Sequence, residues 1–229
     1  MSQFDVWEKE YRNPKLISNS DEPQIDFKHF VSWLRKTQHV SLEGLRVLDL
    51  GSGTGKNSLF LADRGSIVTG IELSKTAVKI ATERAEQKNL DVKFLEGDIS
   101  KKIPFPRNSF DLVLDVVSSN SLTEEERKNY LDEVDRVLKP SGFMYVKALC
   151  KDGDKNAEKL IKKFPGIEPD TYTMPEANLT ERVFSKQDIE KLYSQHFKIL
   201  QLERKQSYTQ FQDKSYKRNF WNIYLQQFD

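Results

Sequence analysis

Cysteine and histidine are scarce in this sequence. The 229 residues include one cysteine, Cys150, and three histidines that are far apart in the chain. A single cysteine cannot form an internal disulfide, and this set offers no ligand spacing typical of a zinc site. We therefore expect neither a disulfide framework nor a bound metal.

Long apolar runs and an excess of one charge are also missing. No apolar stretch approaches the ~18 residues of a membrane-spanning helix, and no cationic segment followed by an apolar one marks a leader. The chain has 36 Lys plus Arg against 35 Asp plus Glu, a formal net charge of +1. Balanced charge gives no global attraction to nucleic acid or to an anionic membrane. We expect a cytoplasmic protein that acts on neither, and the sequence leaves its oligomeric state unknown.

Strand-like and helix-like segments alternate along the first two thirds of the chain. This alternation predicts a doubly wound, Rossmann-like sheet that is mostly parallel and has helices on both faces. The expected strands are 45–50, 67–72, 91–96, 110–116 and 142–149, and the expected helices are 25–37, 56–64, 75–88 and 123–138. At this length one domain suffices, with its core at 41–150.

The last third of the chain has a looser pattern. Residues 151–182 are polar and proline-containing, with one amphipathic helix expected near 156–164, and we interpret them as a substrate-side insertion. The segment 183–229 should hold a helix followed by strands at 197–204 and 220–228. Because the link between those strands is too short for a helical crossover, they should be antiparallel neighbours that complete a seven-stranded sheet.

The segment 47–55, Val-Leu-Asp-Leu-Gly-Ser-Gly-Thr-Gly, is the most informative stretch. A buried-strand pattern runs into alternating glycines and then a helical segment, an arrangement that binds nucleotide cofactors through close backbone approach and free helix amides. The dinucleotide fingerprint is G-x-G-x-x-G/A. Here the third glycine, Gly55, comes one residue early and Lys56 follows it, so the spacing favours S-adenosylmethionine over a nicotinamide dinucleotide.

Acidic residues end the following strands. Glu72 comes about 20 residues after the glycine loop, where a carboxylate can accept hydrogen bonds from both hydroxyls of a ribose. Asp98 follows the third strand and can accept a hydrogen bond from an adenine amine, and Asp115 ends the fourth. Each of these residues also has an ordinary explanation as a turn or cap residue.

These motifs, in this order, resemble the class I S-adenosylmethionine-dependent methyltransferase family over roughly residues 40–150. Residues 53–62 are similar to the small-molecule branch that includes tellurite-resistance and thiol methyltransferases. The resemblance implies that S-adenosylmethionine is the cofactor and S-adenosylhomocysteine the product. It also implies the cofactor-binding residues, which are Asp49, Gly51, Ser52, Gly53, Glu72, Leu73, Asp98, Ile99, Asp115 and Val116.

The acceptor should enter above the end of the fourth strand, beside Ser118. Asp115 is the titratable group there, and three roles stay open for it: orienting the cofactor's ammonium group, acting as a base, or finishing a turn. We identify no other catalytic side chain, because proximity and exclusion of water can supply most of the rate.

Aromatic residues outside the core are candidates for acceptor binding. Within the N-terminal extension 1–40, Trp7 and Tyr11 are helically spaced, so they either form a lid over the cofactor, as the resemblance suggests, or simply pack. Tyr172, and also Tyr216, Arg218 and Trp221, either line an acceptor pocket or cover the sheet.

The sequence therefore predicts a methyltransferase acting on a small molecule. A protein side chain is the alternative acceptor. A nicotinamide-dependent oxidoreductase and a non-catalytic module that binds cofactor and meets a partner through 151–182 are less favoured.

Overall fold

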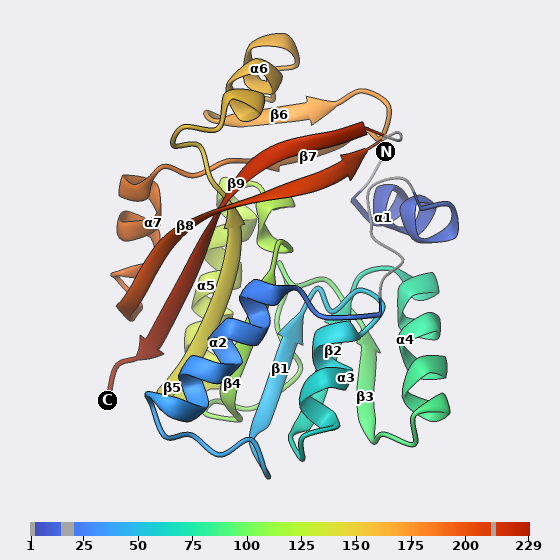
Figure 1. Cartoon of the computed structure of the whole chain (residues 1–229), viewed down its shortest axis with the longest axis vertical. Coiled ribbons are helices and arrows are strands. Elements are labelled where there is room, and N and C mark those ends of the chain that lie inside the picture. The colour runs from blue at the N-terminus through green and yellow to red at the C-terminus, as the bar shows by residue number, and fades with distance from the viewer. Residues whose placement is uncertain (1–2, 15–20, 212–213) are drawn as a thin grey trace.

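A seven-stranded sheet forms the centre of the protein (Figure 1). The computed structural model describes residues 3–14, 21–211 and 214–229, with the backbone alone for 209–211 and 214. The sheet order is β3-β2-β1-β4-β5-β9-β8. These strands are β1 Arg46–Leu50, β2 Ile67–Glu72, β3 Val92–Glu96, β4 Phe110–Val116, β5 Leu138–Leu149, β8 Phe197–Phe211 and β9 Lys214–Gln227. The first five are parallel and the last two antiparallel, which confirms the predicted fold class.

Helices cover both faces of the sheet. On one face, α2 (Ile25–Lys36) and α3 (Lys56–Ala62) pack on β1, β4 and β5 around aromatic rings, with Phe30 stacked 4.7 Å from Tyr145. On the other face, α5 (Glu124–Val137) and α7 (Lys186–Tyr193) bury a second cluster that includes Val134 and Ile189. Another helix, α4 (Lys75–Gln87), packs along β3 and β2. Because the sheet order reverses between β1 and β4, a crevice opens at their carboxyl ends.

The last two strands extend beyond their predicted bounds. β9 pairs with β5 through residues 220–226, and the rest of β9 pairs only with β8, so a two-stranded ribbon rises above the carboxyl ends of the parallel strands (Figure 1). The expected strands 197–204 and 220–228 were too short because the residues of the ribbon are mostly polar and carry little apolar signal. The link itself, 212–213, lies outside the described residues.

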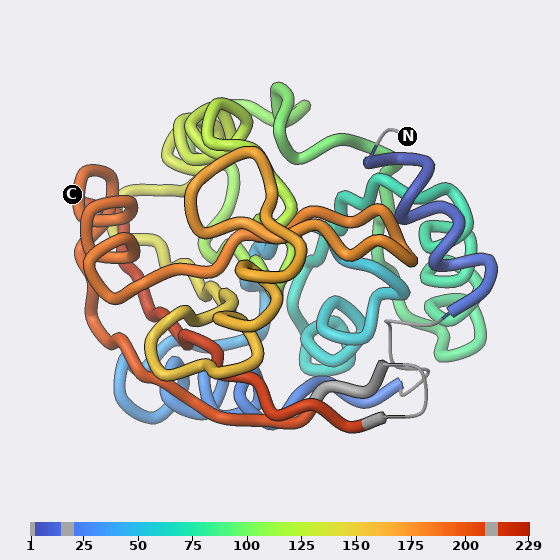
Figure 2. The backbone as a smooth tube through the Cα atoms, turned by 90° about the horizontal axis from the view of Figure 1, so that it is seen from above, coloured from blue at the N-terminus to red at the C-terminus, as the bar shows by residue number. Residues whose placement is uncertain are grey.

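The insertion after β5 has more structure than the sequence predicted. It contains the expected helix, α6 (Lys155–Lys163), and also an antiparallel hairpin that was missed, formed by β6 (Thr171–Met174) and β7 (Leu179–Arg182). Each of these strands has only four residues, too few for a periodic pattern to be recognised. Seen from above, the hairpin extends over the carboxyl edge of the sheet toward α1 (Gln3–Arg12) (Figure 2).

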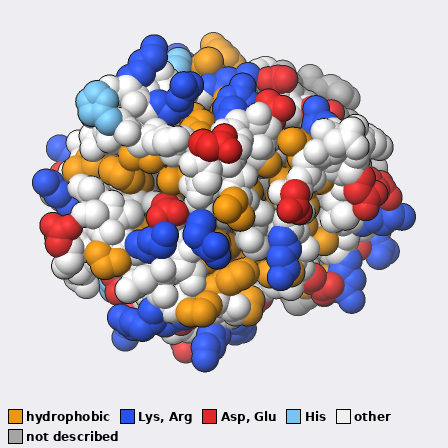
Figure 3. Space-filling view, turned by 90° about the horizontal axis from the view of Figure 1, so that it is seen from below, with side chains coloured by type: hydrophobic (Ala, Val, Ile, Leu, Met, Phe, Trp, Pro, Cys, Tyr) orange, Lys and Arg blue, Asp and Glu red, His pale blue; other side chains and the backbone are white. Residues whose placement is uncertain are grey.

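The amino ends of the parallel strands form the opposite face. There, acidic and basic side chains are interspersed, with small separate apolar patches between them (Figure 3). In the part of the chain that the structure describes, no helix is both long enough and apolar enough to cross a membrane. Of the N-terminal extension 1–40, residues 1–2 and 15–20 lie outside the described residues.

Candidate functional site

The glycine loop between β1 and α3 packs too closely against its neighbours for side chains. Gly51 and Gly53 have φ of +67° and +54°, in the left-handed region that glycine adopts without strain. A Cβ on Gly51 would lie 2.3 Å from Ser118 Oγ, and one on Gly53 would lie 2.7 Å from the Tyr11 hydroxyl. The loop therefore touches both the turn after β4 and helix α1.

Glu72 fixes this loop from the end of β2. Its Oε2 accepts a hydrogen bond from the Gly53 amide at 2.9 Å, and its Oε1 accepts one from the Ser74 amide at 2.8 Å. The residue is only 5% exposed. Each oxygen keeps a further lone pair for a ligand.

Asp49, Glu72 and Asp115 form a cluster of buried carboxyl groups at the ends of three adjacent strands. Burial raises the pKa of all three carboxyl groups. For Asp49, burial and the repulsion by Glu72 and Asp115 outweigh a 2.6 Å hydrogen bond from Ser58 Oγ, and the pKa is raised to about 6. The cluster thus concentrates negative charge under the glycine loop, which favours a cationic ligand.

Asp115 is occupied by the turn that follows β4. Its Oδ1 accepts hydrogen bonds from the amides of Ser118 and Ser119, and its Oδ2 accepts one from the Tyr130 hydroxyl at 2.8 Å. These contacts favour the third of the roles considered for it, which is finishing a turn. Val117 in this turn has a φ of +68°, which is strained for a β-branched residue.

A cavity of about 1150 Å³ opens above the glycine loop. It exceeds the ~300–1,000 Å³ of a typical small-molecule pocket, so it has room for a cofactor together with an acceptor. Its lining includes most of the predicted site residues, namely Trp7, Tyr11, Gly51, Ser52, Gly53, Glu72, Leu73, Asp98, Ile99, Val116 and Ser118.

Three predicted site residues do not line this cavity. Asp49 and Asp115 point into the protein beneath it, where they bond to Ser58 and to the β4 turn. Tyr172 is buried in an apolar cluster, and its hydroxyl meets Glu181 and Arg218. All three remain predictions as site residues, and the first two can act on a ligand only through their charge.

The far side of the cavity comes mainly from residues after 146. Tyr216 and Arg218 line it, whereas Trp221 is buried with its Nε1 donating to the Phe184 carbonyl. Sequence reasoning missed many other lining residues, among them Lys56, Lys147, Leu160, Met174, Leu179, Glu181 and Phe220. Leu160 and Phe220 lie in an expected helix and strand, but no local pattern indicated that any of these side chains faces the cavity.

Helix α1 is attached to the start of α4 by one carboxylate. Glu8 accepts hydrogen bonds from the Ser74 hydroxyl and from the Thr76 amide and hydroxyl, at 2.7 to 3.2 Å. Burial raises the pKa of Glu8, but these hydrogen bonds outweigh it and lower the pKa to about 2. The attachment positions Tyr11 of α1 over Gly53.

Replacing Glu8 with alanine should detach α1 at neutral pH. We expect the free energy of unfolding to fall by ~1–3 kcal/mol and trypsin to cleave faster after Lys9 and Arg12. Because folding lowers this pKa, the stabilisation is complete above the ordinary value of 4.5 and decreases as the pH falls toward about 2.

Urea unfolding at pH 7 and pH 3 measures this effect. The difference between wild type and Glu8→Ala should be larger at pH 7. Lys9→Ala, which changes an exposed residue of the same helix, should match wild type at both values. An equal difference at both pH values would mean that Glu8 acts through packing alone.

Residues 47–142 match a family model described as a methyltransferase domain. A phthiotriol/phenolphthiotriol dimycocerosates methyltransferase of Mycobacterium ulcerans is 35% identical over 127 residues, which cover 55% of this chain and 44% of that protein. A demethylmenaquinone methyltransferase of Thermus thermophilus is 34% identical over 126 residues, covering 53% and 56%. The chain thus spans about half the length of these curated relatives.

Solved structures share the fold over most of the chain. One, described as a S-adenosylmethionine-dependent methyltransferase from Methanosarcina mazei, aligns with a TM-score of 0.74 and 25% identity, covering 84% of this chain and 97% of that one. TehB from Haemophilus influenzae aligns with a TM-score of 0.67 and 18% identity, covering 91% and 64%. The latter likeness concerns the fold alone.

Proposed function

We propose that this protein, whose residues 47–142 match a methyltransferase-domain family model, transfers a methyl group from S-adenosylmethionine to a small-molecule acceptor. The activity, the cofactor and the acceptor are all part of this proposal.

The buried carboxyl cluster is the observation that carries the proposal. S-adenosylmethionine has a positive sulfonium and a positive ammonium group, which Asp49, Glu72 and Asp115 would attract. A nicotinamide dinucleotide would instead bring a negatively charged pyrophosphate to the glycine loop, where the same three groups would repel it. The electrostatics therefore support the cationic cofactor that the glycine spacing favours.

Two polar side chains in the cavity wall also fit this cofactor. Among the described residues, Ser52 Oγ and Asn57 Oδ1 are buried without a hydrogen-bond partner. Buried polar atoms are normally paired, so a bound ligand is the natural partner for them. Asn57 Oδ1 can accept a hydrogen bond from an ammonium group.

We assign the cofactor's parts to residues of the cavity. Gly51, Gly53 and Asn57 would hold the methionine part, and Glu72 the two ribose hydroxyls. Asp98 would accept from the adenine amine, with Leu73 and Ile99 against the ring. The bound sulfonium supplies an electrophilic methyl group, so the chain has to hold the acceptor in line with it and exclude water. Helix α1 and the β6–β7 hairpin would form the cover.

The acceptor half of the cavity favours a small molecule. It is a concave space walled by the hairpin, α6 and the β8–β9 ribbon, which suits an enclosed ligand better than a protein surface. The named substrates of the two curated relatives, demethylmenaquinone and phthiotriol compounds, are small molecules as well. A protein side chain stays the alternative acceptor, and a non-catalytic module would bind cofactor and transfer nothing.

Thermal unfolding with S-adenosylmethionine, S-adenosylhomocysteine or NADH tests the cofactor. We expect the two sulfur compounds to raise the midpoint and NADH to leave it unchanged. Asp49→Asn keeps the shape and the Ser58 hydrogen bond but removes one charge, so it should weaken S-adenosylmethionine binding by about tenfold. A response to NADH alone would refute the proposal.

The pH dependence of Asp49→Asn provides the matched check. Because folding raises the pKa of Asp49 from 3.8 to about 6, its ionisation destabilises the unliganded wild type as the pH rises through about 6. The unliganded variant should therefore be the more stable protein at pH 8 and equal to wild type near pH 4. S-adenosylmethionine affinity of wild type should fall below about pH 6 more steeply than that of the variant.

A further inference from the structure

One face of the β6–β7 hairpin lines the acceptor half of the cavity. Tyr172 pairs with Glu181 across the hairpin, and Met174 pairs with Leu179, so these four residues share a face. Met174, Leu179 and Glu181 line the cavity. Thr173 and Thr180, bonded to each other at 2.8 Å, occupy the other face. Of the strand residues on this face, two apolar side chains and the Glu181 carboxylate therefore line the cavity, and Glu176 in the turn between the strands adds a second carboxylate.

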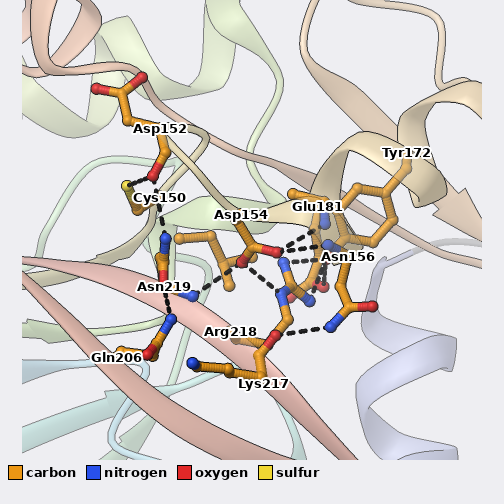
Figure 4. Close-up of polar contacts among 12 residues, drawn as sticks. Cys150, Asp152, Asp154, Asn156, Tyr172, Glu181, Gln206, Lys217, Arg218 and Asn219 are labelled. Carbon is orange, nitrogen blue, oxygen red and sulfur yellow. Dashed lines mark hydrogen bonds and ion pairs between the residues drawn. The ribbon is translucent and has the colours of Figure 1, made fainter.

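A hydrogen-bond network fixes this carboxylate in place (Figure 4). The Tyr172 hydroxyl donates to Glu181 Oε2 at 2.7 Å, and Arg218 donates to the same hydroxyl oxygen from both terminal nitrogens, at 3.1 and 3.2 Å. Arg218 Nε donates in turn to Asp154, which caps α6. Burial raises the pKa of Tyr172, so this phenol stays protonated and serves as a hydrogen-bond donor.

The second oxygen of Glu181 is available to a ligand. No described residue donates a hydrogen bond to Oε1. Strand β7 packs against the short 3-10 helix η1 (Ser119–Ser121), which follows the carboxyl end of β4 where methyl transfer would take place. Glu181 and Val116 thus line the same cavity.

The Glu181 carboxylate itself distinguishes among nucleophiles, because the rest of the cavity lining mixes acidic and basic side chains. An ammonium acceptor beside Glu181 would be held as an ion pair, and its protonated nitrogen has no lone pair for the methyl carbon, whereas a neutral hydroxyl keeps its lone pairs. Met174 and Leu179 instead offer contacts for an apolar ring or chain. A neutral molecule that carries an acidic hydroxyl satisfies both conditions.

Building on the proposed function, we propose that the acceptor is an apolar molecule bearing a phenol-type hydroxyl and that Glu181 Oε1 accepts the hydroxyl proton during transfer. The hydroxyl oxygen forms a bond to the methyl carbon while the bond from that carbon to sulfur breaks and leaves its electron pair on sulfur. The proton passes to Glu181, and the products are a methyl ether and S-adenosylhomocysteine. Glu181 is thus a catalytic general base.

Three ligands of similar shape test the choice of nucleophile. Wild type is assayed with S-adenosylmethionine and 2-naphthol, 2-naphthalenethiol or 2-naphthylmethylamine, which is an ammonium ion at neutral pH, and naphthol should be methylated fastest. Binding of S-adenosylhomocysteine is measured separately by calorimetry. If S-adenosylhomocysteine did not bind, the proposed function itself would be wrong. If it bound but the amine or the thiol were methylated faster than naphthol, or naphthol were not methylated, only the present inference would be overturned.

The variants test the role of Glu181. Glu181→Gln should reduce kcat for 2-naphthol by ~10²–10³-fold, the range of general-base catalysis, while naphthol binding measured calorimetrically with S-adenosylhomocysteine present changes less than about threefold. A nitro-substituted naphthol that is already ionised in the assay needs no base, so the variant should methylate it at nearly the wild-type rate. Thr180→Val, on the opposite face of β7, should behave as wild type. Equal losses for both naphthols, or no loss for either, would contradict the role of base.

Discussion

Replacing Glu72 with alanine should reduce the affinity for S-adenosylmethionine at least ~100-fold. The substitution removes the acceptor for the Gly53 and Ser74 amides, and it removes the proposed partner of both ribose hydroxyls. Hydrogen bonds to a charged group contribute about 1.5–3 kcal/mol each, and two of them exceed the 2.7 kcal/mol that corresponds to a factor of 100. Isothermal titration calorimetry measures the loss directly.

Two further variants separate binding from loop structure. Glu72→Gln retains one oxygen acceptor and should lose less affinity than Glu72→Ala. Asp98→Ala changes a residue whose Oδ1 accepts from the Ser100 amide at 2.8 Å, and it should weaken binding without altering the glycine loop. If Glu72→Ala bound S-adenosylmethionine within about threefold of wild type, the assignment of the ribose site would be wrong.

Gly51→Ala should cost about 2–5 kcal/mol of unfolding free energy and abolish cofactor binding. The new methyl group would lie 2.3 Å from Ser118 Oγ and 2.5 Å from Ser118 Cβ, so the loop or the turn after β4 must move. Alanine also pays ~1–2 kcal/mol for a φ of +67°. Urea unfolding gives the first quantity and calorimetry the second.

Gly44 provides a matched control. It has a similar φ of +71°, but a Cβ there meets no atom within 4 Å, so Gly44→Ala should cost only the backbone strain. The double variant Gly51→Ala, Ser118→Gly should recover the part of the loss that comes from the contact. If Gly51→Ala were as stable as Gly44→Ala, the glycine loop and the turn after β4 would be able to move apart without cost, and the contact with Ser118 would not limit this position.

The sequence predicted the sheet and its helices because their patterns are long. The strands at 47–50 and 110–116 are mostly apolar and largely buried, and Thr123 with Glu126 forms the capping box that begins α5. The predicted ends of some strands were wrong, because contacts with neighbouring strands decide where those strands begin and end. Strand β5 starts at Leu138 rather than 142, because Leu138 itself pairs with Phe110 before a register shift.

The convergence of residues around the glycine loop, the proposed cofactor half, was predictable for a topological reason. Parallel strands end at one edge of a sheet, so residues that follow β1, β2, β3 and β4 must meet there wherever they lie in the chain. This topological rule does not predict whether a given side chain points into the cavity or into the core. Asp49 and Glu72 both end apolar strands, yet only Glu72 lines the cavity.

The acceptor half could not be predicted in the same way. Its walls come from a hairpin of four-residue strands and from a polar ribbon, neither of which has a strong local pattern. Glu181 becomes a candidate only because its partner in the hairpin, Tyr172, is held by Arg218 from a strand 46 residues away. Contacts between residues so far apart in the sequence form only when the chain folds, so no local pattern predicts them.

The ribbon and the hairpin have a consequence for how this protein can diversify. The family model ends at residue 142, before the segments that wall the acceptor half, whereas the glycine loop, Glu72 and Asp98 all lie within it. Substitutions after residue 150 can therefore reshape the proposed acceptor wall without altering the residues proposed to hold the cofactor. The two halves of the proposed site can vary separately within a single chain.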